Sequence, residues 1–131
     1  MRVERTFDEE IIREVLTKTG EDASQEIVDA SLSMYICLAV YENSLIGALA
    51  LRPITENIFE IHISMFEKGV GREALSLGVQ WAFENTPAEK IIGLFKENRK
   101  DVKNVLKKAG LKYEGRISMK KEDIIIYGVD K

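Results

Sequence analysis

The chain has 131 residues, of which 45% are hydrophobic and 31% are charged, which is enough apolar material for one domain with its own core. Its net charge of −3 argues against a nucleic-acid binder that works by bulk charge. One cysteine excludes an internal disulfide, and Cys37 with His62 gives too few soft ligands for a structural zinc site, so we expect no metal.

The longest apolar runs, MYICLAV and LIGALAL, are far shorter than the ~20 residues that a bilayer-spanning helix needs. The N-terminal segment MRVERTFDEE contains no apolar stretch of the kind that a secretory signal carries. Cys37 lies inside an apolar run, which favours a buried and unreactive thiol. We therefore expect a cytoplasmic protein that binds neither membranes nor nucleic acids.

In the first half of the chain the pattern predicts a strand, two helices and a two-stranded hairpin. Asp8 can cap the first helix, and Gly20 can end it. The hairpin turns at ENS, and Pro53 stops its second strand. In chain order these elements are expected at 3–6, 9–18, 23–30, 34–41 and 45–52.

The second half begins with NIFEIHISM, whose apolar and polar residues alternate as in a strand. The apolar residues would point one way, and Glu60, His62 and Ser64 would point the other. The order of elements predicts a single domain, 1–131, of mixed α/β (α+β) type, with one sheet flanked by helices. The remaining elements are expected as helix 72–84, strand 91–94, helix 100–109 and strands 111–119 and 124–129.

A glycine pair, Gly69 and Gly71, lies between this strand and the next helix, in FEKGVGREALSLGVQWAFENT. A strand–helix–strand crossover of this length normally makes its two strands parallel. Glycines in the loop let a ligand approach the backbone, and the helix N-terminus attracts an anion such as pyrophosphate. Lys68 and Arg72 would then favour binding. The alternative is a glycine-rich turn beside two solvated cations, and the residues alone leave both interpretations open.

This stretch, with FKENRKDVKNVLKKAGLKYEG after it, resembles the acetyl-CoA-binding half of the GNAT acetyltransferase superfamily over residues 34–129. The family's loop signature is Gln/Arg-x-x-Gly-x-Gly/Ala; both glycines match, and Phe66 stands where the family has Gln or Arg. Asn98, AGL at 109–111 and EG at 114–115 match the family's pattern further along. The resemblance implies a small single-domain member, of a kind that phages also encode. It also implies a mostly antiparallel mixed sheet with a central βαβ acetyl-CoA-binding unit.

The resemblance further implies how acetyl-CoA would bind as a co-substrate. Main-chain amides at 70–72 would bind its pyrophosphate, and main-chain groups at 64–66 would pair with its pantetheine arm. The arm would enter where two parallel strands diverge, and Asn98 would hold it from the other side. The implied cofactor-binding residues are Ser64, Met65, Phe66, Lys68, Gly69, Val70, Gly71, Arg72 and Asn98.

Acetyl transfer to an amine needs a general base, because an ammonium has no lone pair with which to attack. The family commonly uses a Glu on the strand that leads into the loop, where Glu60 and His62 share one face, and either could be the catalytic residue. The alternative is a polar strand face covered by water or by the N-terminal helices. The family's tyrosine that protonates the leaving thiolate is missing, because Leu106 occupies its position. Tyr113 or Tyr127 could substitute, unless both are half-buried sheet aromatics.

The expected function is an N-acetyltransferase in which an amine attacks acetyl-CoA directly. The acceptor would be a small amine, a lysine or a protein N-terminus, and the acidic N-terminal region would suit a cationic one. One alternative is a catalytically inactive GNAT-like module for binding or assembly. Another is an α/β protein that binds a different phosphate-bearing ligand. A homodimer could form if the strand IIIYGV paired between subunits.

Overall fold

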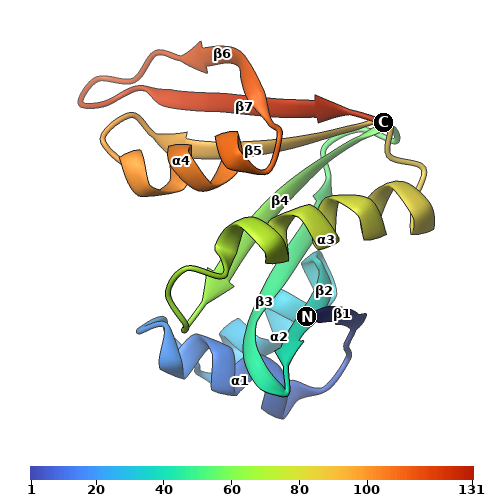
Figure 1. Cartoon of the computed structure of the whole chain (residues 1–131). Coiled ribbons are helices and arrows are strands. Elements are labelled where there is room, and N and C mark those ends of the chain that lie inside the picture. Colours follow the sequence, from blue (N-terminus) through green and yellow to red (C-terminus); the bar gives the residue numbers. More distant parts are fainter.

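The computed structural model describes residues 1–131 and contains one seven-stranded sheet with four helices packed against it (Figure 1). The strand order is β1-β2-β3-β4-β5-β7-β6, and only β4 and β5 run parallel. The predicted mixed, mostly antiparallel sheet with a parallel crossover is confirmed. In chain order the elements are β1 Arg2–Arg5, α1 Glu9–Lys18, α2 Gln25–Met34, β2 Ile36–Glu42, β3 Ser44–Pro53, β4 Ile58–Met65, α3 Gly71–Asn85, β5 Lys90–Lys96, α4 Lys100–Lys108, β6 Lys112–Ile117 and β7 Ile124–Asp130.

Each of the two N-terminal helices begins directly after a residue whose side chain caps it. The Asp8 carboxylate accepts a hydrogen bond from the Glu10 N–H at 2.9 Å, so α1 begins as predicted. Ser24 caps α2 in the same way. This second helix runs to Met34 rather than ending at 30, because nothing in the sequence stops it there. The Ser31 hydroxyl donates back to the Ile27 carbonyl at 2.8 Å and so fits inside the helix.

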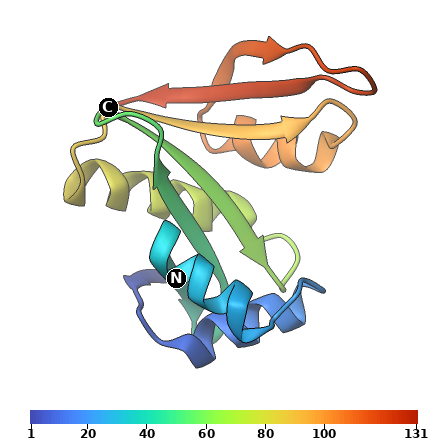
Figure 2. The same cartoon turned by 180° about the vertical axis from the view of Figure 1, so that it is seen from behind.

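The helices cover the sheet from both sides. Helices α3 and α4 lie on one face, and α1 and α2 lie on the other face, over β2 to β4 (Figures 1 and 2). On this second face no helix covers β5 and β7 (Figure 2). Helix α3 lies close to the sheet because Gly78 faces Leu49 and Ile61, and a Cβ at this position would overlap Leu49. The main core lies between α3 and the sheet.

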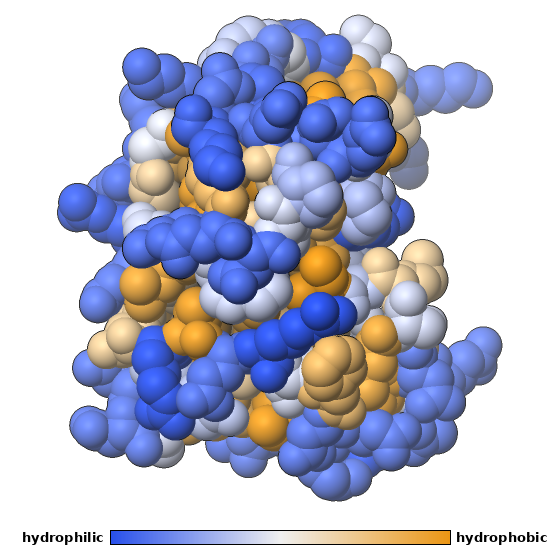
Figure 3. Space-filling view, turned by 90° about the vertical axis from the view of Figure 1, so that its right-hand side faces the viewer, coloured by the Kyte–Doolittle hydropathy of each residue, from blue (hydrophilic) through white to orange (hydrophobic).

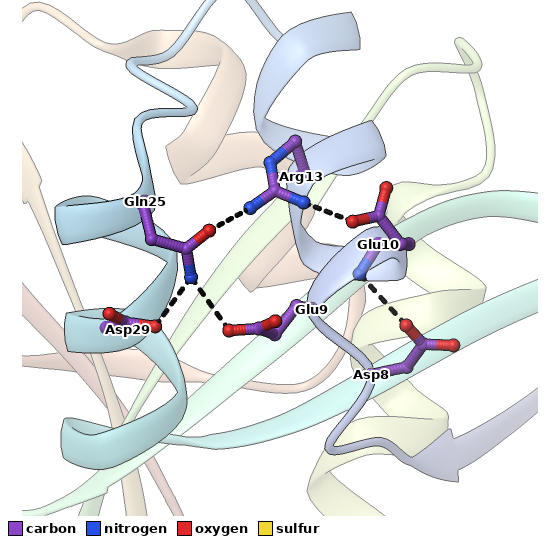
Figure 4. A network of polar contacts seen from close by, with 6 residues as sticks. All are labelled: Asp8, Glu9, Glu10, Arg13, Gln25 and Asp29. Atoms are coloured by element: carbon purple, nitrogen blue, oxygen red, sulfur yellow. Dashed lines mark hydrogen bonds and ion pairs between the residues drawn. The ribbon is translucent and has the colours of Figure 1, made fainter.

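A network of polar side chains joins α1 to α2 (Figure 4). The Gln25 amide donates to Glu9 at 2.7 Å and to Asp29 at 2.8 Å, and Arg13 donates to the Gln25 oxygen at 2.6 Å. Arg13 also pairs with Glu10. Gln25 therefore joins the two helices through Glu9 and Arg13, whereas Asp29 and Glu10 are each held within their own helix.

Strands β4 and β5 pair over a short stretch and then diverge (Figure 1). Their register begins at Ile58↔Lys90 and ends at Glu60↔Ile92. Beyond that point β4 continues beside β3, whereas β5 continues beside β7. The sheet therefore opens between the C-terminal ends of its two parallel strands, as the family resemblance implied.

The edges of the sheet are β1 and β6. Strand β7, which contains IIIYGV, lies between β5 and β6, so the prediction that it could pair between subunits is wrong. The side of the molecule in Figure 3 shows apolar residues in small groups that hydrophilic side chains separate. This view therefore shows no single broad apolar patch of the kind that marks a large interface. A homodimer stays a prediction.

Cys37 is buried, as predicted, and burial raises the pKa of its thiol. None of the helices is both long enough and apolar enough to cross a bilayer. No group of three or more His, Cys, Asp or Glu side chains is arranged to hold a metal ion.

Gly47→Ala should destabilise the fold by about 1–3 kcal/mol, because a Cβ there has no space. It would lie 2.5 Å from the Ser64 carbonyl oxygen and 2.8 Å from the Met65 Cα, and both are main-chain atoms of the neighbouring strand. Urea unfolding measures the loss. Gly115→Ala is the matched control, since a Cβ at this strand glycine meets nothing within 4 Å. Equal stability of the two variants would contradict the close approach of β3 and β4.

Candidate functional site

The loop before α3 leaves main-chain donors free. Gly69 has a φ of +82°, a conformation that favours glycine. The N-cap of α3 is Val70, which has no polar side chain and makes no capping hydrogen bond. The N–H groups of the first helical turn have no partner within the helix. This helix N-terminus therefore offers several aligned donors and a partial positive charge, which suit a phosphate group.

A cavity of about 370 Å³ lies between this loop, the end of β4 and α4. Four of the predicted site residues line it: Met65, Lys68, Gly69 and Gly71. Helix α4 supplies an apolar wall, Val102 and Val105, and Asp101, and its N-cap Arg99 lies beside them. Glu67 of the loop also lines the cavity. The structure thus brings together a glycine loop, a cation and an apolar wall at the opening between β4 and β5.

The register of β4 shows which main-chain groups face this opening. The Phe66 N–H donates to the Ile46 carbonyl at 3.1 Å, so Phe66 is a hydrogen-bonded partner of β3. Hydrogen-bonded and non-hydrogen-bonded pairs alternate along an antiparallel ladder. Ser64 therefore pairs with β3 as well, whereas the main-chain groups of Ile63 and Met65 point to the opposite side, beyond the last residues that pair with β5. The sequence prediction named Ser64, Met65 and Phe66, and only the main-chain groups of Met65 among these point to the opening.

The other predicted residues lie around the cavity rather than on its wall. The centroid of the Phe66 ring lies 4.6 Å from Lys18 Nζ of α1, a cation–π contact. Asn98 lines a neighbouring cavity of about 690 Å³, and its N–H donates to Glu122 at 2.6 Å. Arg99, the next residue, lines both cavities. Val70 packs on the main core, and Arg72 is exposed in the first turn of α3.

Arg99 holds Asp101 by two hydrogen bonds of 3.0 Å on the cavity wall. These bonds lower the pKa of the Asp101 carboxyl from 3.8 to about 2. Because the folded-state pKa is depressed, the stabilisation is present above the ordinary pKa and is lost as the pH falls towards 2. Carboxyl NMR titration should place the midpoint near 2, and Arg99→Gln should raise it towards 3.8. Arg116→Gln is the control, and an unchanged midpoint in Arg99→Gln would contradict the pairing.

Glu60 and His62 lie on the face of β4 that is opposite the loop cavity. They lie at the point where β4 and β5 stop pairing and begin to diverge. The Glu60 side chain is 3% exposed and that of His62 is 46% exposed. The His62 Nε2 contacts Glu60 Oε1, and Arg52 Nη2 of β3 lies 3.5 Å from the same oxygen. The Tyr35 ring meets the His62 ring edge-on, with 5.6 Å between the centroids. This arrangement orients an accessible imidazole with a buried carboxylate behind it.

The structure therefore brings the two predicted catalytic residues into contact, and it adds Arg52 and Tyr35. Arg52 is directly opposite Glu60 in the β3–β4 register, but it is eight positions away in the chain. The sequence predicted that β2 and β3 form a hairpin, but it did not predict which residues of β3 and β4 lie opposite each other. Without that register, no pattern in the sequence could have assigned Arg52 to this cluster.

The tyrosine candidates do not line the loop cavity. Tyr127 is 6% exposed and packs edge-on against Phe95, with 5.3 Å between the ring centroids. Tyr113 is 58% exposed and contacts Tyr127 at the edge of the sheet. Leu106 is buried against Gly93 of β5, so it points into the core. The cavity wall on α4 is apolar at Val102 and Val105.

No protein-family model and no curated protein matches the sequence. Solved structures do match over nearly the whole chain. A variant of spermidine N-acetyltransferase from Vibrio cholerae has a TM-score of 0.80 and 14% identity, covering 99% of this chain and 95% of its own. A GNAT-family acetyltransferase from Bacillus anthracis has a TM-score of 0.80 and 18% identity, with the same coverage.

The ribosomal-protein-S5-alanine acetyltransferase from Vibrio fischeri has a TM-score of 0.75 and 16% identity, covering 98% of this chain and 91% of its own. The Vibrio cholerae spermidine enzyme also matches in a complex with CoA and spermine, with a TM-score of 0.74 and 14% identity, covering 98% of this chain and 94% of its own. Identities this low establish the fold alone. The protein has the fold of the GNAT acetyltransferases, as its sequence resemblance predicted.

Proposed function

We propose that the protein is a cytoplasmic N-acetyltransferase that transfers the acetyl group of acetyl-CoA to an amine by direct attack, without a metal. The observation that carries the proposal is the opening between β4 and β5. It has an uncapped helix N-terminus at one end and the Glu60–His62 pair at the other. The stretch of β4 from Glu60 to Met65 spans about 17 Å at the usual rise of a strand. The fold, and a neighbour that was solved with CoA and spermine, support this proposal.

The residues around the opening fit acetyl-CoA, which supplies an activated thioester carbonyl. The N–H groups of Val70, Gly71 and Arg72 would bind the pyrophosphate, with Lys68 as a nearby cation and Gly69 shaping the loop. This is the chemistry that an uncapped helix N-terminus accommodates.

The main-chain groups of Ile63 and Met65 would pair with the pantetheine arm, in place of those of Ser64 and Phe66, which pair with β3. Arg99, rather than the predicted Asn98, would hold the pantetheine arm from the opposite wall. Arg99 lines the loop cavity, whereas Asn98 lines only the neighbouring one. Val105 would contact the arm from α4.

His62 would be the general base, and Glu60 would be its positioning partner. The imidazole is accessible, whereas the carboxylate is almost fully buried behind it. His62 would accept the proton that the acceptor's ammonium must lose before its nitrogen can form the amide bond. Glu60 would fix the orientation of the ring. The sequence left the choice between these two residues open, and their exposure favours His62.

The acceptor would be a primary amine, on a small molecule, a lysine or a protein N-terminus. The test is incubation of the purified protein with acetyl-CoA and a panel of such amines, with CoA thiol release and product mass as readouts. Acetylated product from at least one amine is the expected result. Binding of acetyl-CoA without transfer to any amine would favour a catalytically inactive GNAT-like module, the alternative that remains.

A further inference from the structure

Arg52 has spare hydrogen-bond donors beside the Glu60–His62 pair. Its guanidinium makes one hydrogen bond to a side chain, from Nη2 to Glu60 at 3.5 Å, near the outer limit for such a bond. A guanidinium carries five N–H donors in a planar fork. The Arg52 Nε is the one buried side-chain nitrogen or oxygen in the chain that has no hydrogen-bond partner. The side chain as a whole is 38% exposed, so solvent reaches part of it, although not the Nε, and its guanidinium lies 5.8 Å from the centroid of the Tyr35 ring.

The charges around this cluster do not favour a polyamine. Glu60 is the only carboxylate that contacts His62 and Arg52, and the cation of Arg52 faces it directly. An acceptor with a second ammonium near this cluster would place that charge close to the Arg52 guanidinium, and Glu60, the carboxylate that contacts this guanidinium, is already paired with it.

We propose that Arg52 binds an anionic group of the acceptor, so that the preferred substrates are amines that carry a carboxylate close to the amine, as α-amino acids do. The proposal rests on the proposed function. Arg52 Nη2 and His62 Nε2 contact the same Glu60 oxygen, so they lie within about 6 Å of each other. Because Glu60 engages Nε2, the nitrogen free to accept a proton is Nδ1, about 2 Å further across the ring. The amine and the carboxylate of an α-amino acid are separated by about 3 Å, and a hydrogen bond of about 2.9 Å at each end lets one molecule reach both side chains. Arginine is the side chain whose fork matches a carboxylate.

The test compares matched acceptors that differ only beside the amine. Each set contains an amino acid, its carboxamide and the amine left by decarboxylation, with phenylalanine, glutamate and lysine as the three side chains and spermidine as a further acceptor. The readout is the ratio of kcat/KM between members of a set. For the wild type we expect the carboxylate member to exceed the decarboxylated amine by about tenfold or more, the worth of one charge-assisted hydrogen bond. The carboxamide should fall between them.

Two variants distinguish two possible roles of Arg52, binding the substrate carboxylate and positioning Glu60. Arg52→Met should bring the ratio close to one, and Arg52→Lys should keep part of it. If Arg52 only positions Glu60, both variants will lower all rates alike and leave the ratio unchanged, which would overturn the proposal. A preference for spermidine or for the decarboxylated amines would overturn it as well.

The proposal remains testable if no acceptor is acetylated. Calorimetry would then measure the affinity of each acceptor in the same sets for the protein saturated with CoA, and the ratio of affinities within a set gives the preference. Equal affinity within every set would overturn the role of Arg52. Failure of acetyl-CoA itself to bind would overturn the proposed function instead.

Discussion

His62→Gln should lower kcat for acetyl transfer by about 10²–10⁴-fold, the usual contribution of a positioned general base. Glutamine fills similar space and can still form a hydrogen bond with Glu60, but it cannot accept a proton at neutral pH. His62 is the accessible member of the pair, with 46% of its side chain exposed, so it is the one that can meet the acceptor. Steady-state kinetics with the best amine of the panel measures the effect.

The His62 variant should bind acetyl-CoA with unchanged affinity, because the imidazole lies on the face of β4 opposite the loop cavity. Glu114→Gln is the matched control: it neutralises a carboxylate elsewhere in the sheet, where its partner is Lys90. This control should leave kcat unchanged. A His62 variant with wild-type kcat would show that another group removes the proton, and Glu60→Gln would then be the next variant to measure.

Gly71→Glu should weaken acetyl-CoA binding by about 100-fold, because it places a carboxylate where we propose that the pyrophosphate binds. A Cβ at this position is 3.4 Å from Val105 Cγ1, an ordinary contact, so the first atom of the new side chain meets no clash. An acidic residue in the first turn also suits the helix dipole, so the fold should lose no stability. Calorimetric titration gives the affinity, and urea unfolding gives the stability.

Gly71→Gln separates charge from bulk at the same position. It has nearly the shape of glutamate without the charge, so it should retain much more of the affinity. If the two variants bind acetyl-CoA equally well, charge at the α3 N-terminus has no part in binding. The pyrophosphate would then have to lie elsewhere.

Local signals predicted most of the fold. The capping residue Asp8 and the acids after it predicted α1, and the helix spans the expected residues. The strand–helix–strand order predicted that β4 and β5 run parallel, because a crossover of this length normally joins parallel strands. The C-terminal end of α2 was not predicted, because serine is typical of loops. Here the Ser31 hydroxyl donates to a carbonyl of the preceding helical turn, so the helix continues.

The candidate site was harder to predict, because it depends on contacts between strands. The alternation along β4 placed Glu60 and His62 on one face, and the structure confirms that they lie together. Arg52 joins them only through the register of β3 against β4. The same register decides which main-chain groups of β4 face the opening: those of Ile63 do, whereas those of Ser64 are hydrogen-bonded to β3. A motif fixes spacing along the chain, whereas these contacts depend on pairing across the sheet.

The central claim is that the opening between β4 and β5 binds acetyl-CoA, and calorimetric titration tests it most directly. Acetyl-CoA, CoA and ATP would be titrated separately into the purified protein. The account predicts micromolar binding of acetyl-CoA and no comparable binding of ATP. No binding of acetyl-CoA at millimolar concentration would contradict it, and the loop at Gly69 and Gly71 would then be only a turn.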